Sequence, residues 1–361
     1  MNQKFYFVDQ SLENKNAINI FGSMILLVVL IGIPSFNFQI LFFTCCFLFF
    51  LYSSFVLNKP LKFDIFIIFL ILFLFLMLIL SFINDNSKLT NPIILLESLL
   101  LIFIYSTFSV NSRTIFYVIF FSFLIFFFNF GWDKIFKYQH SISMVGMLFS
   151  LFYIVTGKKK YGILLLLLTI PIATRSVILG YFIGMNLWFF RNLLSDRGSK
   201  LIAIIIIIGL LTLSIFLGYF EFENFDLIEF STMRSIFYRV SVEDLLLRGL
   251  SIFFPTGNDY SSSLLTNLEF YIDTDHRLYE YLKSFDHQCV HSIFLEWLIN
   301  YGVFFMVFFI LVLFKMANKK NIYFIAPFLI VIGFQCEALK PIVLVPFFIV
   351  YNLSNNFKVI Q

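Results

Sequence analysis

Long apolar runs separated by short polar segments recur along nearly the whole chain. A helix needs about 20 apolar residues to cross a hydrocarbon core of about 30 Å, with a working range of about 17 to 25 residues. The runs do not alternate between apolar and polar residues, so they predict helices and not barrel strands. Twelve spans are expected, at residues 17–35, 37–57, 63–83, 92–110, 114–131, 141–157, 161–174, 176–190, 201–220, 290–314, 322–336 and 341–353.

The expected spans at 161–174 and 176–190 are together too short for two full crossings. Thirty helical residues cover about 45 Å, whereas two crossings need roughly 60 Å. Pro171 and the TRS segment at 174–176 fall at the apex of the pair. Non-helical backbone at that depth is tolerated only where it lines protein or a wet cavity. We therefore expect a short or re-entrant pair with Arg175 facing an outward-opening polar cavity; a topological anchor that reaches the interface is the alternative for this residue.

The one long polar segment, residues 221–288, follows the ninth span. It carries twelve of the 21 acidic residues, yet apolar and aromatic residues continue through it. The stretch MRSIFYRVSVEDLLLRGLSIFF has helical periodicity, with an apolar side formed by Met233, Ile236, Phe237 and Val240. PTGND at 255–259 predicts a turn. An ordered cap with one or two short helices is expected here.

Composition places the chain among integral membrane proteins, since 60% of its residues are hydrophobic, 13% are charged and 55 are Phe. We expect a single membrane domain over 1–361, with 221–288 inserted as an external loop. Cytoplasmic loops carry the excess of Lys and Arg. With the N-terminus inside, fifteen cations lie inside and five lie in the short outside loops, which predicts both ends in the cytoplasm. The inside group is Lys4, Lys15, Lys59, Lys62, Arg113, Lys158, Lys159, Lys160, Arg191, Arg197, Lys200, Lys315, Lys319, Lys320 and Lys358.

Several function classes have no support in the sequence. The basic residues are dispersed over loops and form no continuous stripe, so nucleic acid is not an expected partner. No Cys and His spacing suggests a metal site, and no glycine-rich nucleotide loop is present, so neither a metal nor a cofactor is expected. Cys289 and Cys336 are both predicted near the outer surface, where an oxidising compartment would allow a disulfide between them.

Two ionisable residues, His291 and Glu296, lie near the start of the expected tenth span, in CVHSIFLEWLINYG at 289–302. A helix-start residue at the interface is one interpretation of His291, and an external polar site is the other. Glu296 lies about 140° around the helix from His291, so the two do not share a face. Gly302 does share a face with His291 and would allow another helix or a lipid chain to approach closely. In the loop, Arg239 could pair with Glu243 on a surface helix, and Arg234 is open to the same interpretation.

Three short motifs together resemble the O-antigen ligase and polymerase superfamily of bacterial inner membranes. His291-Ser292 followed after nine residues by Gly302 is similar to the family's histidine motif. Arg175-Ser-Val-Ile-Leu179 is similar to its earlier arginine motif. The stretch from Arg239 to the turn at Gly257 resembles an arginine-bearing loop helix followed by a glycine turn. The resemblance covers about 160 to 310 and favours the O-antigen polymerase form, because Phe305 stands where the ligase motif has a small residue.

The resemblance implies a metal-independent, inverting glycosyltransferase with a membrane fold of the GT-C type, with its large periplasmic loop between helices 9 and 10. Donor and acceptor would be oligosaccharides carried on undecaprenyl diphosphate, and a chain-length regulator is a partner that the resemblance allows. Arg175, Arg239 and the weaker candidate Arg234 would bind the diphosphate, since the guanidinium fork fits phosphate oxygens. His291 would be the general base, because a neutral imidazole accepts a proton at neutral pH. Gly302, Gly257 and Glu296 are supporting candidates.

Polymerisation of lipid-linked repeat units into O antigen or capsule is the leading hypothesis. Ligation of a finished polymer to the lipid A core is the nearest alternative, since it is the same chemistry with another acceptor. A polysaccharide flippase or other transporter can also have twelve spans, but no internal repeat is visible in this sequence and a 68-residue external loop (221–288) fits an extracytoplasmic enzyme better.

Overall fold

The computed structural model describes residues 112–129, 132–219 and 292–334, parts of the segment 238–253, a few positions between 347 and 354, and the terminal pairs 5–6 and 358–359. The expected spans at 17–35, 37–57, 63–83 and 92–110, most of the span at 341–353, and both cysteines of the suggested disulfide lie outside the described residues.

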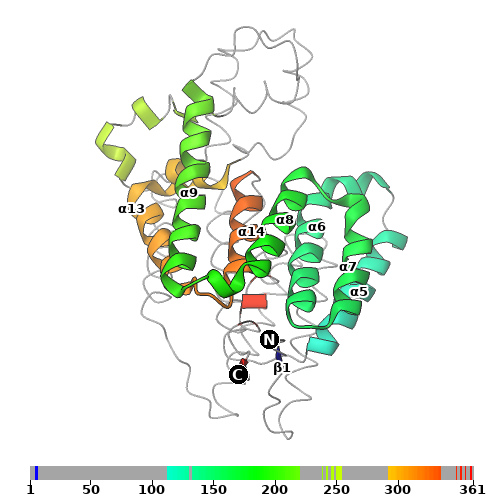
Figure 1. Ribbon diagram of the computed structural model, residues 1–361. Helices are drawn as coiled ribbons and strands as arrows, with labels where there is room; N and C mark the ends of the chain where they lie inside the picture. The colour runs from blue at the N-terminus through cyan, green and yellow to red at the C-terminus, as the bar shows by residue number, and fades with distance from the viewer. Residues whose placement is uncertain are drawn as a thin grey trace, which may run out of the picture.

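The described chain is helical, which confirms the all-α class for this part of the protein. Its one sheet joins the two termini, where β1 (Phe5–Tyr6) pairs antiparallel with β2 (Lys358–Val359). Figure 1 shows both ends of the chain on the same side of the bundle. The α-helices are α5 (Ser112–Asn129), α6 (Trp132–Val155), α7 (Lys159–Thr169), α8 (Arg175–Phe189), α9 (Asp196–Tyr219), α13 (Ile293–Met316) and α14 (Ile322–Gly333). Three 3-10 helices join them: η2 (Ile170–Ile172), η3 (Arg191–Leu193) and η4 (Gly249–Phe253).

Seven of the expected spans fall on these seven helices, with two differences. The predicted outside loop before the span at 141–157 is wrong, because α6 already begins at Trp132, only three residues after α5 ends. Its polar first turns continue the helix beyond the apolar run, which hydropathy alone does not reveal. The expected span at 290–314 corresponds to α13, but that helix is interrupted at Gly302.

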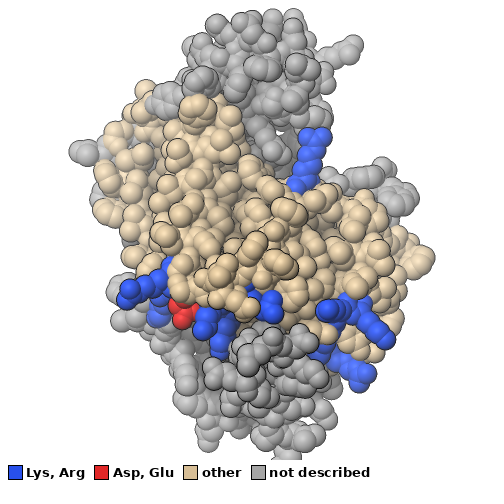
Figure 2. All heavy atoms as spheres, in the orientation of Figure 1, with Lys and Arg blue, Asp and Glu red and all other residues tan. Residues whose placement is uncertain are grey.

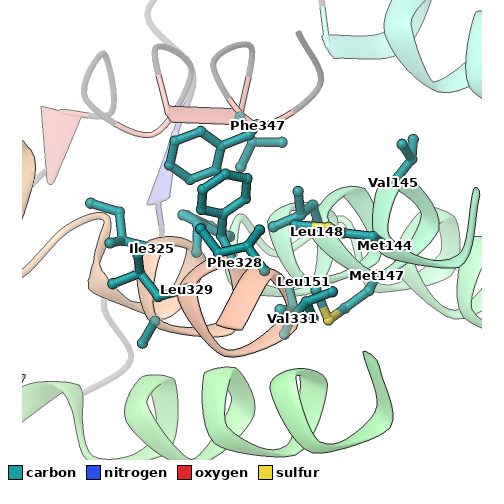
Figure 3. Packing of buried hydrophobic residues seen from close by; sticks show 14 of the residues in the cluster. Met144, Val145, Met147, Leu148, Leu151, Ile325, Phe328, Leu329, Val331 and Phe347 are labelled. Carbon is teal, nitrogen blue, oxygen red and sulfur yellow. The ribbon is translucent and has the colours of Figure 1, made fainter. Parts of the chain in front are cut away.

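Helix α14 is the centre of the described bundle, since all twelve of its residues are buried. It packs against α8 and α9 and also contacts α6. Figure 3 shows Phe328, Leu329 and Val331 of α14 beside methionine and leucine side chains of α6, with Phe347 stacked on Phe328 at 3.9 Å between ring centres. Pro327 lies inside the helix and is itself buried in this packing.

The outer surfaces of the surrounding helices are apolar. Large hydrophobic side chains are exposed along α7, α8, α9 and α13, among them Leu167, Phe182, Ile205 and Phe304. Of the described helices, one is long and apolar enough to cross a membrane: the stretch Asp196–Leu217 of α9. Only 17% of an apolar 18-residue window in this stretch is buried. A core helix of a water-soluble protein of that composition would instead be mostly buried.

Candidate functional site

The apex between α7 and α8 places Arg175 at the end of a helix. Helix α7 ends at Thr169, η2 carries Pro171, and α8 begins at Arg175 itself. Proline in η2 removes a backbone donor and prevents α7 from continuing. The Arg175 side chain is exposed, and the hydroxyls of Thr174 and Ser176 on either side lie 3.2 Å apart. The break predicted from the sequence in this pair is thus present, and the exposed Arg175 begins the helix that follows it.

Helix α8 is held against α14 by two glycines one turn apart. A Cβ atom at Gly180 would lie 3.1 Å from the carbonyl oxygen of Pro327 and 3.2 Å from Val331. A Cβ atom at Gly184 would lie 2.7 Å from the Pro327 ring and 2.9 Å from the carbonyl oxygen of Tyr323. The two helices therefore run antiparallel at close approach, the packing that small residues four apart allow. Continued toward the start of α8, this register sets Arg175 level with the C-terminal end of α14.

The start of α13 meets the same end of α14. A Cβ atom at Gly333 would touch Leu210 of α9 and would lie 3.2 Å from the Phe294 ring of α13. Ser292, the residue before α13, is fully buried, and its hydroxyl is hydrogen-bonded to that of Ser214 in α9 at 3.0 Å. The residue after His291 is thereby tied to α9.

Arg175 and Ser292 thus lie at one level of the bundle, on opposite sides of the end of α14. This level is recessed. Helix α8 ends and α9 begins at the opposite end of the bundle, where η3 joins them. Because α9 has 24 residues and α8 only 15, α9 extends roughly 14 Å beyond the start of α8. Figure 1 shows α9 rising beyond the ends of α8 and α14. We call the level of Arg175 and Ser292 the recessed end of the bundle.

Gly302 interrupts α13 and is in contact with the long loop. Its backbone has φ 80° and ψ 175°, a conformation that is essentially restricted to glycine. A Cβ atom there would lie 2.8 Å from the carbonyl oxygen of Phe253 and 2.9 Å from that of Ile252, both in η4. The Phe253 and Phe304 rings, 5.7 Å apart, add a contact beside it. The close approach expected at Gly302 is made by the backbone of the loop segment.

The described part of the loop before η4 is helical. Tyr238, Ser241, Val242 and Leu245 are buried, whereas Leu247 is exposed. Spacings of three and four residues between the buried positions define one helix face. The face expected from Met233, Ile236, Phe237 and Val240 lies outside the described residues. The loop thus approaches α13 as a helical segment followed by η4.

Most of the other predicted site residues lie outside the described residues. They are His291, Arg234, Arg239 and Gly257. Glu296 lies on α13, but its side chain is likewise outside them. Two of the predicted site residues, Arg175 and Gly302, are therefore placed with their surroundings, and the neighbour of a third, His291, is placed through Ser292.

The opposite end of the bundle is basic. Figure 2 shows Lys and Arg in a band across this end, with an acidic group among them. The cations come from the α5 start, the α6–α7 turn, η3, the first turn of α9 and the α13–α14 turn: Arg113, Lys158, Lys159, Lys160, Arg191, Arg197, Lys200, Lys315, Lys319 and Lys320. Burial of the ammonium, and then the charge of Arg113, lower the pKa of Lys158, which donates to the Ser112 hydroxyl at 2.5 Å. We call this the basic end.

Sequence reasoning missed three features that position the predicted site residues or their neighbours. The G-x-x-x-G spacing of Gly180 and Gly184 is a recognisable signal for close helix packing. Ser214 is one polar residue in an apolar span, and such residues often bond to another helix. The contact of η4 with Gly302 had no signal, because it joins segments fifty residues apart.

Within the described part of the chain, no three His, Cys, Asp or Glu side chains are grouped as metal ligands. Comparisons with models of protein families, with curated proteins and with solved structures gave no match for this chain.

Proposed function

We propose that the protein is a membrane-embedded, GT-C-like glycosyltransferase of about twelve spans that polymerises oligosaccharide repeat units carried on undecaprenyl diphosphate. One lipid-linked oligosaccharide is the donor and another supplies the acceptor hydroxyl. As the acceptor oxygen bonds to the anomeric carbon, the bond from that carbon to the diphosphate breaks. The acceptor proton goes to His291, and undecaprenyl diphosphate leaves. A single displacement of this kind inverts the anomeric carbon.

The observation that carries this proposal is the shared level of Arg175 and Ser292 at the recessed end. A phosphate-binding cation and the residue adjoining the general base must be near each other if both act on one bond. The two come from segments more than a hundred residues apart in sequence, and the short α7–α8 pair and the end of α14 bring them to one level.

The surroundings of Arg175 favour an anionic ligand. It is the first residue of α8, and the first N–H groups of a helix have no intrahelical partner and carry a partial positive charge. No acidic residue is present in the first turn of α8 to compete for them. A diphosphate leaving group would therefore meet a planar guanidinium and the helix N-terminus together.

The distribution of charge supports an orientation. The basic end has the excess of Lys and Arg that is typical of the cytoplasmic side, and β1 and β2 hold both termini together. The recessed end then faces the periplasm of a bacterial inner membrane, where the segment 221–288 would cover it. Roughly 14 Å of α9 beyond Arg175 would place the reacting groups below the outer membrane surface.

Phe305 supports polymerase over ligase. This residue, which stands where the ligase motif has a small residue, is buried and packs against Trp297 at 5.6 Å and Tyr301 at 4.9 Å between ring centres. It belongs to an aromatic row that also includes Phe309. The departure is thus part of the packing of α13, and a small residue would leave a cavity there.

Deletion of the gene in the bacterium that carries it tests the proposal. A polymerase deletion should leave single repeat units on the lipid core in a lipopolysaccharide gel. Polymer retained on the carrier lipid would indicate a ligase instead, and loss of both would indicate a flippase.

Complementation then tests the site. His291→Ala should restore no ladder, whereas the matched control His287→Ala, four residues earlier, should restore it. Both proteins must be present in the membrane at equal levels on a blot. A ladder of normal length from His291→Ala would show that this histidine is not the base.

A further inference from the structure

An arginine and a tryptophan form a close pair at the basic end, where α8 passes into η3. The Arg191 guanidinium carbon lies 5.0 Å from the centre of the Trp188 ring, and Nη1 donates to the Trp188 carbonyl oxygen at 3.2 Å. Arg191 Nε and Trp188 Nε1 are buried and have no hydrogen-bond partner among the described residues. Buried donors almost always have an acceptor. Two adjacent donors of this kind point to an acceptor from beyond the described residues.

The electrostatic surroundings favour an acceptor with negative charge. The α13–α14 turn brings Lys319 and Lys320 to this corner, and the backbone N–H of Lys319 donates to Asp196 Oδ1 at 2.9 Å. Asp196 is the one acidic residue among the side chains described at this end, and that bond already engages its carboxylate. Arg197 adds a further cation one residue later. Cations therefore outnumber acids around the pair.

Large apolar side chains flank the same corner. Phe189 is 71% exposed, Phe190 50% and Leu193 82%. A free inorganic anion gains nothing from contact with apolar side chains. A lipid presents a charged headgroup and acyl chains side by side, so it can contact both the cations and the apolar side chains. Basic pockets between helices at the cytoplasmic side are the sites where anionic headgroups bind.

We infer that Trp188 and Arg191 bind the phosphate of an anionic phospholipid, with the lipid's acyl chains against Phe189, Phe190 and Leu193. Arg191 and Trp188 are both only partly buried. Binding would require these side chains to rotate until Nε and the indole N–H face the phosphate. The inference rests on the membrane placement proposed above, but not on glycosyl transfer, so it can fail or hold independently of the enzymatic activity.

A topological anchor would need only the positive charge of Arg191. A headgroup site also needs the planar fork and the neighbouring donor, which lysine does not supply. Arg191→Lys and Trp188→Phe therefore separate the two roles, since the first keeps the charge and the second keeps the ring. Arg197→Lys is the matched control in the same corner.

The test is lipid binding to the purified full-length protein in neutral detergent. Dioleoyl phosphatidylglycerol and dioleoyl phosphatidylcholine are titrated separately, and bound lipid is followed by native mass spectrometry and by the shift in unfolding temperature. The wild type should bind phosphatidylglycerol preferentially. Arg191→Lys should raise its half-saturating concentration at least about tenfold and Trp188→Phe about threefold, with Arg197→Lys unchanged.

Equal binding of the two lipids by the wild type would overturn the inference, and so would wild-type affinity in both Arg191→Lys and Trp188→Phe. Displacement of the lipid by an equal concentration of inorganic phosphate would also overturn it, because it would indicate a free-anion site. Unfolding temperatures without added lipid show whether each variant is folded. If Arg191→Lys does not yield folded protein, Trp188→Phe decides alone, because it removes one N–H and keeps the ring.

Discussion

The two ends of the described bundle are built from the same helices but differ in charge and in depth. The basic end collects cations from five separate segments at the surface. The recessed end presents Arg175 roughly 14 Å short of the end of α9. Dispersed surface cations are what topology alone requires. A cation set back from the end of α9 needs another reason, and the phosphate binding proposed above would supply one.

Some glycines of the bundle are closely packed and others are open, and both ends contain close contacts: a Cβ atom at Gly162, two residues after Lys160, would lie 2.8 Å from the Ser150 carbonyl oxygen. Gly180, Gly184, Gly302 and Gly333 each lack room for a Cβ atom, and all four lie on helices that form the recessed end. Gly157, in the α6–α7 turn of the basic end, has open space around it. Substitutions that add one methyl group should therefore distinguish closely packed glycines from those with open space around them.

Gly302→Ala should have the largest effect on stability. It forces a non-glycine residue into φ 80° and places Cβ 2.8 Å from a backbone carbonyl of η4. Strain and overpacking together should cost about 2–5 kcal/mol, measured by denaturant unfolding in detergent. Gly157→Ala is the control, since its φ of 82° brings strain without a contact and should cost only about 1 kcal/mol. Equal costs in the two variants would mean that η4 does not pack on Gly302.

Arg175→Gln should have the largest effect on activity among the described residues. Loss of a charge-assisted bond to the leaving diphosphate should slow polymerisation about 10- to 100-fold, measured with lipid-linked repeat units and the purified protein. Arg197→Gln removes a cation from the basic end and should leave the rate within a factor of about two. Equal losses from the two substitutions would indicate an effect of net charge and would remove Arg175 from the site.

Gly184→Ala should lower both stability and activity, by an intermediate amount. The added methyl group would meet the Pro327 ring at 2.7 Å and the Tyr323 carbonyl at 2.9 Å, which forces α8 away from α14. Overpacking of this kind costs about 1–3 kcal/mol. Gly209→Ala, with nothing within 4 Å, is the control and should be neutral or slightly stabilising. If Gly184→Ala is equally neutral, the close packing of α8 on α14 does not set the depth of Arg175.

Hydropathy predicted where helices lie but not how they meet. The break at Pro171 and Arg175 was predictable, because thirty residues cannot make two full crossings and proline ends α7. The start of α6 at Trp132 was not, since polar residues outside the apolar run can continue a helix as well as form a loop. An interruption inside a continuous apolar run, such as Gly302, has no hydropathy signal.

The candidate site shows the same division. Residue types and spacing predicted chemical roles for Arg175 and His291 and a close approach at Gly302. The partners that position them had to come from the fold, because Ser214 and Ser292 are 78 residues apart and η4 is about fifty residues from Gly302. Contacts at such separations depend on which helices are neighbours, and no local pattern encodes that.

Ser292→Ala should have the smallest effect, and it tests how the start of α13 is held. The Ser292 hydroxyl, fully buried, is bonded to Ser214 at 3.0 Å, while Ser214 also bonds the Leu210 carbonyl at 2.8 Å. Removing Ser292 should cost about 1 kcal/mol, and the double variant with Ser214→Ala should cost less than the two single changes added together, because both remove the same bond. If the bond positions His291, Ser292→Ala should slow turnover more than it weakens substrate binding, and Ser292→Thr, which keeps the hydroxyl, should recover part of the rate. Additive costs in the double variant would show that the hydroxyls act separately. The link from α9 to the residue beside the proposed general base would then be absent.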